Sequence, residues 1–461
     1  MPTSRQKARP VYQIVARQSP QPLQCREYHQ RLFEALEKDD NETFELIAQE
    51  HQRLQNTIQL VAAENRCSQP VLAALGSVLQ NKTAEGFPGD RLHSGCEVID
   101  KIESLAVARA KQVFGAAYAN VQPHSGTSAN LIVITALLAK GDKILSLPAE
   151  QGGHFSHGSD DSVTAKLFEI ENYYLDEKTF LLDYESIRQA ALKVRPKLII
   201  CGASVYSRTI DFARFRQIAD EAGAWLLADI SHISALVAAG AHLSPVNHAH
   251  FTTTSTYKPG GPRGGLILMG KDKDSTVNID GKKIALCDLV DKGTFPGLQG
   301  TVYFNNVAAK AVFFKEMLSE KYQAGQFKVI ENAKQLADSL KSRGFDVLTG
   351  GTDNHMVLVN VASFKPPLTA QIARSCLEQC GIVVDPIALP YDQNAGGLRL
   401  GTPIVTKMGM GPEQMDQIAA IIDTVLKEVE PVGHTEFAID LALVESIKTS
   451  VTALCSSFAA F

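Results

Sequence analysis

The stretch TTTSTYKPGGPRGG, from Thr252 to Gly265, is the most informative part of this sequence. Its first half is rich in β-branched residues, which favours a strand, and its second half is a glycine-rich turn. Lys258 stands where the two meet. Because glycine lets backbone N–H groups approach an anion closely, a lysine beside such a turn could contact a phosphate or form a Schiff base.

A Schiff base with a pyridine cofactor also requires an acid that holds the ring nitrogen. The apolar run WLLADI, residues 225–230, supplies Asp229, and His232 follows shortly after it. Two adjacent strand ends, one carrying Asp229 and one carrying Lys258, would place both groups on one flat cofactor. The alternative is that Lys258 is a surface turn residue and that Asp229 caps a helix.

A third element, PHSGTSAN at residues 123–130, precedes an apolar helical stretch. Hydroxyl and N–H groups at a helix N-terminus bind anions, so Ser125, Gly126 and Thr127 are candidates for a phosphate cup. On its own this pattern is typical of an ordinary helix cap. Together with Lys258 and Asp229 it predicts a phosphate site.

Short β-rich runs alternate with amphipathic helical stretches along most of the chain, which predicts an α/β fold with a mainly parallel sheet covered on both faces. Ligands of such sheets bind at the carboxyl ends of the strands. A long helical stretch is expected over residues 302–345, followed by a smaller α+β region. The expected division is an N-terminal tail and helical arm (1–55), a large domain (56–330) and a small C-terminal domain (331–461).

Composition excludes several classes of protein. The 461 residues are 45% apolar and 21% charged, with a net charge of −5, which argues against bulk disorder and against a dedicated nucleic-acid binder. We expect no membrane span and no metal site, and we expect the eight cysteines to be reduced. The Arg-rich, acid-free start is interpreted as a mobile basic tail, with an organellar transit peptide as the alternative.

Several stretches resemble the serine hydroxymethyltransferase family, whose members are pyridoxal-phosphate enzymes of the aspartate-aminotransferase fold. The resemblance runs from about Leu60 to Gly409. The matching stretches are AALGSVLQNKTAEGFPGDR, ANVQPHSGTSANL, GGHFSHGS, RPKLIICGAS, IDFARFRQIADEAGAWLLADISHISALVAAGAHLSPV, the Lys258 segment, FPGLQG and LRLGTP. This likeness implies the fold of type I pyridoxal-phosphate transferases, with a seven-stranded sheet in the large domain and a smaller α+β C-terminal domain.

The resemblance also implies roles for matching residues. Lys258 would carry pyridoxal phosphate as a Schiff base, and Asp229 would keep the pyridine nitrogen protonated. Arg399 would bind the substrate carboxylate with its planar guanidinium, and Glu85 would exchange a proton with the substrate's β-hydroxyl. The other implied cofactor contacts are Ser125, Gly126, Thr127, Gln151, Ser204, His232, Tyr257 and Gly300. The alternatives are a structural pair between Arg399 and an aspartate, and a helix-capping Glu85.

The sequence departs from the family pattern around these positions. The replacements are Ala63 for a serine near the substrate carboxylate, Thr83 for a tyrosine, Leu92 and His93 for a tyrosine pair, Gln151 for the histidine that stacks on the cofactor ring, Tyr257 for a histidine and Thr301 for a glycine. The asparagine that contacts folate in the family falls in the segment VDPI, where Asp385 to Ile387 offer no matching amide. Relative to the family pattern, the residues that contact folate are therefore the ones that have changed most.

Two interpretations remain open. The favoured one is a folate-independent aldolase or transaldolase that cleaves or exchanges the Cα–Cβ bond of β-hydroxy α-amino acids. The other is an ordinary tetrahydrofolate-dependent enzyme, or an α-methylserine enzyme for which Ala63 leaves room near the α-carbon; Thr83 is counted with Ala63, Glu85 and Arg399 among the substrate-binding residues. A non-catalytic binding protein is the alternative that the set of Lys258, Asp229 and Arg399 argues against. The expected partners are amino acid and aldehyde substrates, with a homodimer that shares its active sites, or a tetramer, in the cytoplasm.

Overall fold

The computed structural model describes residues 31–279 and 281–458. The chain divides into two compact units, Met1–Glu50 and His51–Phe461. Helix α2 (Leu32–Asp39) and most of helix α3 (Asn41–Asn56) belong to the first unit. The sequence predicts helix from about residue 24, and the stretch before residue 31, with its basic residues, lies outside the described part of the chain.

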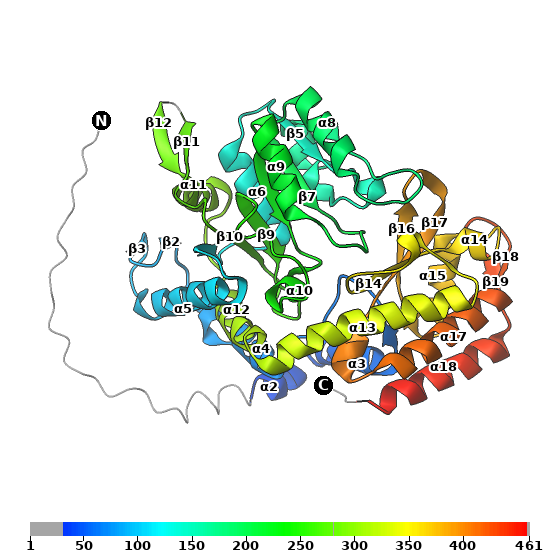
Figure 1. Ribbon diagram of the computed structural model, residues 1–461. Helices are drawn as coiled ribbons and strands as arrows, with labels where there is room; N and C mark the ends of the chain where they lie inside the picture. Colours follow the sequence, from blue (N-terminus) through cyan, green and yellow to red (C-terminus); the bar gives the residue numbers. More distant parts are fainter. Residues whose placement is uncertain (1–30, 280, 459–461) are drawn as a thin grey trace. The chain divides into compact units, whose positions relative to one another are not determined.

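The second unit is built around a seven-stranded sheet with the strand order β4-β10-β9-β8-β7-β5-β6 (Figure 1). The strands from β6 through β9 pair in parallel, and β10 runs antiparallel to both β9 and β4. The expected mainly parallel sheet is therefore confirmed. The strands are β4 (Tyr118–Asn120), β5 (Lys143–Ser146), β6 (Glu169–Asn172), β7 (Leu198–Gly202), β8 (Trp225–Asp229), β9 (Phe251–Ser255) and β10 (Gly265–Met269).

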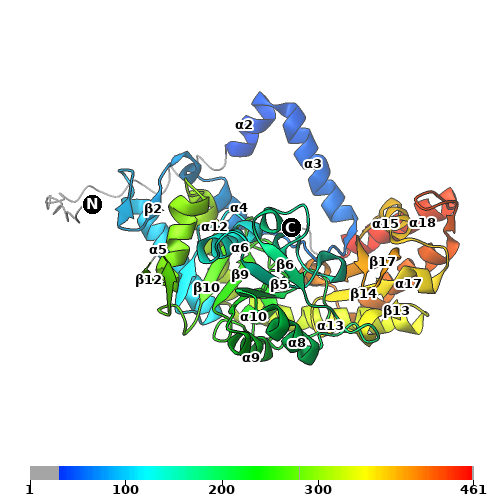
Figure 2. The same cartoon turned by 90° about the horizontal axis from the view of Figure 1, so that it is seen from above.

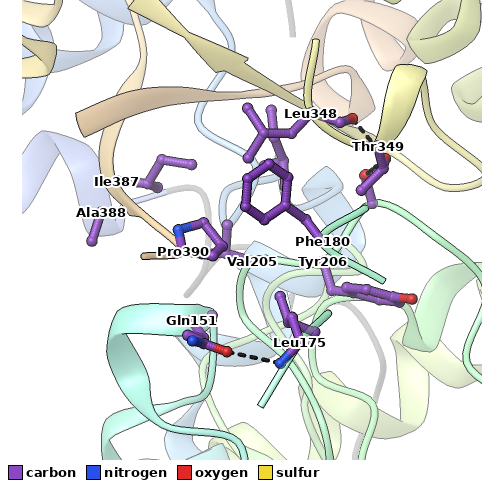
Figure 3. Close-up of a pocket in the computed structure, with 13 residues that line it drawn as sticks. Gln151, Leu175, Phe180, Val205, Tyr206, Leu348, Thr349, Ile387, Ala388 and Pro390 are labelled. Carbon is purple, nitrogen blue, oxygen red and sulfur yellow. Dashed lines mark hydrogen bonds between the residues drawn. The ribbon is translucent and has the colours of Figure 1, made fainter. Parts of the chain in front are cut away.

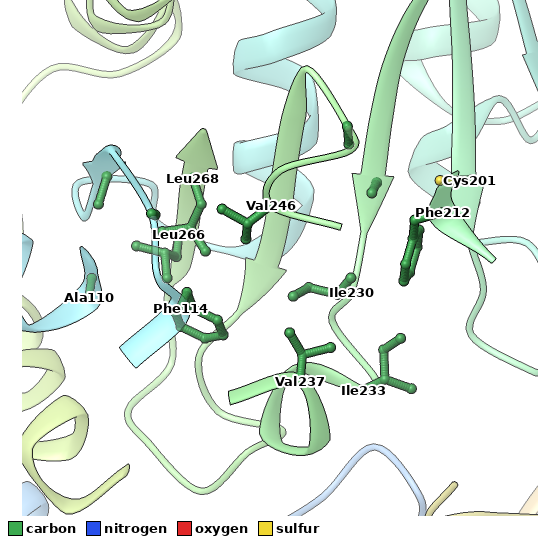
Figure 4. Packing of buried hydrophobic residues seen from close by; sticks show 14 of the residues in the cluster. Ala110, Phe114, Cys201, Phe212, Ile230, Ile233, Val237, Val246, Leu266 and Leu268 are labelled. Carbon is green, nitrogen blue, oxygen red and sulfur yellow. The ribbon is translucent and has the colours of Figure 1, made fainter. Parts of the chain in front are cut away.

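Both faces of this sheet are apolar because successive side chains of a strand point to opposite sides. In β8, Leu227 joins one buried cluster with α6 and α11, whereas Leu226 and Ala228 join another with α5, α9 and α12. Figure 4 shows the second cluster, where strand residues Leu266 and Leu268 lie near Phe114. The helices of this region are α5 (Glu97–Phe114), α6 (Gly126–Leu137), α8 (Tyr184–Val194), α9 (Phe212–Ala222), α10 (Ser234–Ala238), α11 (Leu286–Lys292) and α12 (Phe304–Met317).

The helical stretch expected over residues 302–345 consists of two helices, α12 and α13 (Glu320–Ser342). The break has a local cause, because the Ser319 side chain accepts a hydrogen bond from the Tyr322 N–H and so begins a new helix. Asp183 and Asp211 cap α8 and α9 in the same way. These caps fix where the covering helices start.

A second, smaller sheet lies towards the C-terminus, with the order β13-β14-β17-β16 and antiparallel pairing throughout (Figure 2). Its helices and strands share a separate buried core, which also contains Ile58 and Leu60 from the start of the unit. The elements of this part are β1 (Ile58–Gln59), β13 (Asp346–Val347), β14 (Met356–Asn360), β15 (Ile382–Val383), β16 (Asp385–Leu389), β17 (Asp392–Gly401), α14 (Val361–Phe364), α15 (Ala370–Gln379), α16 (Pro403–Met408), α17 (Pro412–Glu428) and α18 (Leu441–Ser456).

Short elements complete the described chain. They are α4 (Gln69–Leu75), α7 (Val163–Leu167) and the hairpins β2 (Gly86–Phe87) with β3 (Asp90–Arg91), β11 (Thr276–Ile279) with β12 (Lys282–Ala285), and β18 (Glu430–Pro431) with β19 (Phe437–Ala438). Among the described residues, every helix is too short or too polar to cross a bilayer. The seven described cysteines are free thiols.

Candidate active site

The carboxyl ends of β8 and β9 meet at one edge of the large sheet. The two strands are parallel, with Asp229 opposite Thr253, so the chain leaves both strands at the same level. Asp229 is the last residue of β8, and Lys258 follows three residues after the end of β9. Both side chains line one cavity of about 220 Å³. Its other lining residues are His124, Ser125, Gly126, Thr127, His154, Ser231, Ser255, Tyr257, Arg263 and Gly264.

The N-terminus of α6 opens into the same cavity. Ser125 caps this twelve-residue helix, and its Oγ accepts a hydrogen bond from the Ser128 N–H at 3.0 Å. A side chain at Gly126 would come within 3.2 Å of the Ser255 Cβ, so glycine is what lets the helix start lie against the end of β9. Ser125, Gly126 and Thr127, which the sequence predicts to bind a phosphate, thus lie in the same cavity as Lys258.

Asp229 is buried and held by a dense set of donors. Its Oδ2 accepts from Asn130 Nδ2 at 2.8 Å and from His157 Nε2 at 3.2 Å, and its Oδ1 accepts from the Ser231 N–H and hydroxyl. Burial alone would raise the pKa of Asp229, but the hydrogen bonds from His157 and Asn130 and the electrostatic interaction with the neighbouring histidines outweigh it and place the pKa far below its usual value. The carboxylate is therefore ionised at neutral pH.

The orientation of His157 follows from its own contacts. The backbone N–H of His154 points at His157 Nδ1 at 3.4 Å, which leaves Nε2 to donate to Asp229. The ligand atoms of His154, His157 and Asp229 lie within 4.8 Å of one another, a set that a metal ion could also use and that the sequence did not indicate. His157 lies in the stretch GGHFSHGS, which matches the family, but the resemblance implies no role for it.

His232 interacts electrostatically with a basic residue that follows the large sheet and with one from the small sheet. It is buried, stacks on His355 with ring centroids 5.8 Å apart, and its Nδ1 has no hydrogen-bond partner among the described residues. Burial lowers the pKa of His232 well below its usual value, and the positive charges of Lys258 and Arg399 lower it further. Arg399 comes from β17 of the small sheet, so both basic groups act on one imidazole.

Arg399 has a partner within the protein. Its Nη2 lies 2.7 Å and its Nε 3.2 Å from Asp385 Oδ2, while Nη1 donates to the Ser204 carbonyl oxygen at 2.6 Å. Asp385 on β16 and Arg399 on β17 are opposite each other in the antiparallel ladder. The arginine–aspartate pair that the sequence left as an alternative is thus present, and Ser204 contacts Arg399 through its backbone.

Gln151 does not line the Lys258 cavity of the described structure. Its Oε1 accepts from the Leu175 N–H at 2.8 Å, which turns the amide into a different crevice. His124 and His154 are the imidazoles that line the Lys258 cavity, and burial lowers the pKa of His154 to about 4, so that this second ring is neutral at pH 7. Tyr257 lines the cavity, and the centroid of its ring lies 5.0 Å from Lys258 Nζ.

Glu85 and Gly300 lie beside each other, since a Cβ at Gly300 would be 3.1 Å from Glu85 Oε1. Arg91 anchors the adjoining hairpin through Asp100 Oδ1 at 2.9 Å and Glu103 Oε2 at 2.5 Å. Among the described residues that line the Lys258 cavity, neither Glu85 nor Gly300 is included. The exposed Thr83 and the half-buried Ala63 also do not line the Lys258 cavity of the described structure.

Lys310 on α12 is a buried lysine that sequence reasoning missed. Its Nζ donates to the carbonyl oxygens of Val121 (2.6 Å), Pro123 (3.1 Å) and Gly265 (2.8 Å). The carbonyls of Val121 and Pro123 belong to the loop that leads into α6. The carbonyl of Gly265 belongs to the first residue of β10, where the turn that follows Lys258 ends. A Cβ at Gly264 would lie 2.4 Å from Lys310 Cε, so the lysine stem uses the space that this glycine leaves open.

Lys310 therefore clamps the two loops of the phosphate cup. Burial lowers the pKa of Lys310 to about 7, and the negative charge of Glu103 opposes this shift. Three ammonium hydrogens matched to three carbonyls satisfy the whole donor capacity of a lysine. The only sequence signal was a lysine in the otherwise apolar middle of α12, next to Ala309 and Ala311.

We predict that Lys310→Met lowers the free energy of unfolding by about 3 kcal/mol, because three buried carbonyls lose their donor. Urea denaturation of the purified protein measures this change. Lys315→Met, on an exposed position of the same helix, is the matched control and should change stability by less than about 0.5 kcal/mol. Equal stability of the two variants would contradict the clamp.

Known proteins are similar to this chain over most of its length. A family model described as serine hydroxymethyltransferase matches residues 36–422. A serine hydroxymethyltransferase of Methanosarcina barkeri (strain Fusaro) is 44% identical over 400 residues, covering 86% of this chain and 94% of that protein. One from Nostoc punctiforme is 47% identical over 392 residues, covering 84% and 88%. The chain belongs to the serine hydroxymethyltransferase family.

Serine hydroxymethyltransferases are pyridoxal-phosphate-dependent enzymes of fold type I, which confirms the predicted family, cofactor and enzyme class. A second loop of the chain also reaches the lysine turn, because Asn65 Nδ2 donates to the Lys258 carbonyl oxygen at 3.2 Å. Asn65 ends the VAAEN segment, which begins at Val61 and contains Ala63. The roles of the individual side chains remain predictions.

Proposed function

We propose that this member of the family cleaves and exchanges the Cα–Cβ bond of β-hydroxy α-amino acids, releasing or taking up an aldehyde, and that it does so without tetrahydrofolate. The observation that supports the first part is the common cavity of Lys258, Asp229 and the α6 N-terminus, with Arg399 close enough to act on the same histidine as Lys258. The second part is supported by an apolar crevice described below.

The residues of the cavity fit pyridoxal phosphate. The N-terminus of α6 with Ser125, Gly126 and Thr127 suits the phosphate, the Lys258 amine suits the aldehyde carbon, and the ionised Asp229 suits the ring nitrogen. When bound, the cofactor supplies a conjugated cationic ring that takes up the electrons released when a bond to the amino acid's α-carbon breaks.

Asp229 would hold the proton on the ring nitrogen of the bound cofactor, because an ionised carboxylate stabilises a neighbouring N–H⁺. His157 and Asn130 fix its orientation and keep it anionic. His232 stays neutral at pH 7 because it is buried among the charges of Lys258 and Arg399. An uncharged imidazole can bond to an oxygen of the cofactor or the substrate without adding a charge.

Arg399 would hold the substrate carboxylate and thereby set the direction of the Cα–Cβ bond relative to the cofactor. Glu85 would remove the proton from the β-hydroxyl as that bond breaks, so that the β-carbon leaves as an aldehyde and the proton resides on the Glu85 carboxylate. The α-carbon then receives a proton, which yields glycine, or attacks a second aldehyde, which yields a new β-hydroxy amino acid.

The crevice that supports folate independence is shown in Figure 3. The Phe180 ring lies among Val205, Leu348 and Pro390, with Ile387 nearby. The remaining space measures about 10 Å³, which holds no more than one water molecule. By the resemblance, the segment with Ile387 replaces the one whose asparagine contacts folate, so a polar contact is exchanged for packed apolar side chains. Losing such a contact costs about 1–3 kcal/mol when its partner stays buried.

The second candidate is an ordinary tetrahydrofolate-dependent serine hydroxymethyltransferase. It is favoured by the identity of 44% and 47% to proteins of that name. An α-methylserine enzyme is a variant of this candidate, since Ala63 carries no hydroxyl where the family has a serine. A non-catalytic binding protein is disfavoured by the fully formed environment of Asp229 and Lys258.

The test is glycine formation by the holoenzyme from L-threonine and from L-serine, each with and without tetrahydrofolate. We expect tetrahydrofolate to change either rate by less than about twofold, because the polar contact that the family makes to folate is replaced here by apolar side chains. The Nostoc punctiforme relative, assayed in parallel, is the control that shows the folate to be active. A stimulation of tenfold or more for this chain would establish the ordinary enzyme instead.

We further propose that two copies share their active sites. Glu85 and Gly300 adjoin each other without lining the Lys258 cavity of their own chain. Large apolar side chains are exposed on the elements around them. They are Leu72 on α4, Val78, Leu92 after β3, Val98 on α5, Leu298 and Tyr303. A second copy would cover these side chains and receive Glu85 at its own lysine.

A further inference from the structure

The guanidinium of Arg399 is already partly engaged. Of its five N–H groups, two donate to Asp385 Oδ2 and one to the Ser204 carbonyl oxygen. One N–H therefore remains on Nη1 and one on Nη2. These two are enough for a single further carboxylate, so a substrate would bind to an arginine that keeps its protein partner.

The charge of Arg399 is also balanced before any substrate arrives. Its side chain is 11% exposed and that of Asp385 is 26% exposed, so water screens the pair only in part. Asp385 further borders an outer hollow of about 340 Å³ together with Glu64, Arg374 and Glu378. Arg374 is paired with Glu378 at 3.2 Å, so the Asp385 charge is not neutralised from that side.

A carboxylate on the remaining N–H groups of Arg399 would be close to the Asp385 carboxylate. Like charges at short range in a partly buried site repel each other, which weakens binding. Arg399 still provides direction through its planar donors, because its position is fixed by Asp385 and Ser204. The Arg399–Asp385 pair would therefore orient the substrate carboxylate but attract it only weakly.

We propose that Asp385 is a specificity-determining residue, which weakens the hold of Arg399 on the substrate carboxylate and excludes amino acids that carry a second carboxylate. This inference rests on the proposed function, since it presumes that Arg399 receives the substrate's carboxylate. The substrate class is accordingly narrowed to monocarboxylic β-hydroxy amino acids whose side chain has no negative charge.

The test compares the wild-type holoenzyme with Asp385→Asn by calorimetric titration with glycine and with aminomalonate, which has a second carboxylate. Asparagine keeps the shape and one acceptor for Arg399 but removes the charge. We expect the dissociation constant of glycine to fall about 3- to 10-fold and that of aminomalonate by a larger factor. Asp385→Ser serves as a second variant if the first does not fold.

Asp353→Asn is the matched control, because it removes the charge from another Arg–Asp pair, in which Arg208 Nη1 lies 3.0 Å from Asp353 Oδ1 and Arg399 takes no part. Both dissociation constants should stay within about twofold of the wild type in this variant. Weaker or unchanged glycine binding in Asp385→Asn would overturn the proposal for Asp385 and leave the proposed function standing. A wild-type holoenzyme that binds no amino acid would overturn both.

Discussion

Lys258→Ala is expected to lower turnover of every β-hydroxy amino acid by about 10⁴-fold or more. Lys258 is the lysine of the cavity that also contains Asp229 and the α6 N-terminus. Without its amine the cofactor has no covalent attachment to the protein, and no other lysine of the described chain lines that cavity. The measurement is glycine formation by the purified variant with added pyridoxal phosphate, together with the amount of cofactor retained after borohydride reduction.

Lys271→Ala is the control for this experiment. Lys271 is exposed, lies just after β10 and is absent from the described cavity lining, so its loss should leave turnover unchanged. Turnover of the Lys258→Ala enzyme within tenfold of the wild type would refute the role of this lysine, and with it the proposed chemistry.

The second large effect is expected from mixed dimers. Chains with Lys258→Ala and chains with Glu85→Gln are co-expressed with different tags, and the doubly tagged dimer is isolated. If Glu85 acts at the lysine of the other copy, one of the two sites in this dimer is intact and the other is doubly defective. The mixed dimer should therefore reach about half of the wild-type rate, although both parent enzymes are nearly inactive.

A wild-type chain paired with the double variant Lys258→Ala/Glu85→Gln gives the reciprocal result. Each site of that dimer lacks one of the two groups if they come from different copies, so it should be inactive. If the groups came from the same chain, the wild-type half would keep its own site and about half the activity. An inactive first dimer with an active second one would contradict the shared site.

The sequence was sufficient to predict the parallel sheet and the meeting of Asp229 with Lys258, because both follow from local patterns. A buried strand that ends in a polar residue projects that residue at the sheet edge, and adjacent parallel strands end together. The α6 N-terminus was predictable for a similar reason, since Ser125 and Gly126 are typical of a helix start.

Contacts between distant segments could not be predicted in this way. Lys310 lies 187 residues from Pro123 in the chain, and Arg399 lies 195 residues from Ser204. Nothing in the local sequence around Gln151 shows that its amide bonds to Leu175 rather than facing the cofactor. Such pairings depend on how whole elements pack, which a single sequence without an alignment does not reveal.

The contact between the Lys310 stem and Gly264 also constrains attempts to redesign this enzyme. A library that varies Gly264 alone will consist mainly of destabilised members, since an added Cβ would lie 2.4 Å from the Lys310 Cε. Residues 264 and 310 therefore have to be varied together, so that each larger residue at position 264 is paired with a shorter residue at position 310.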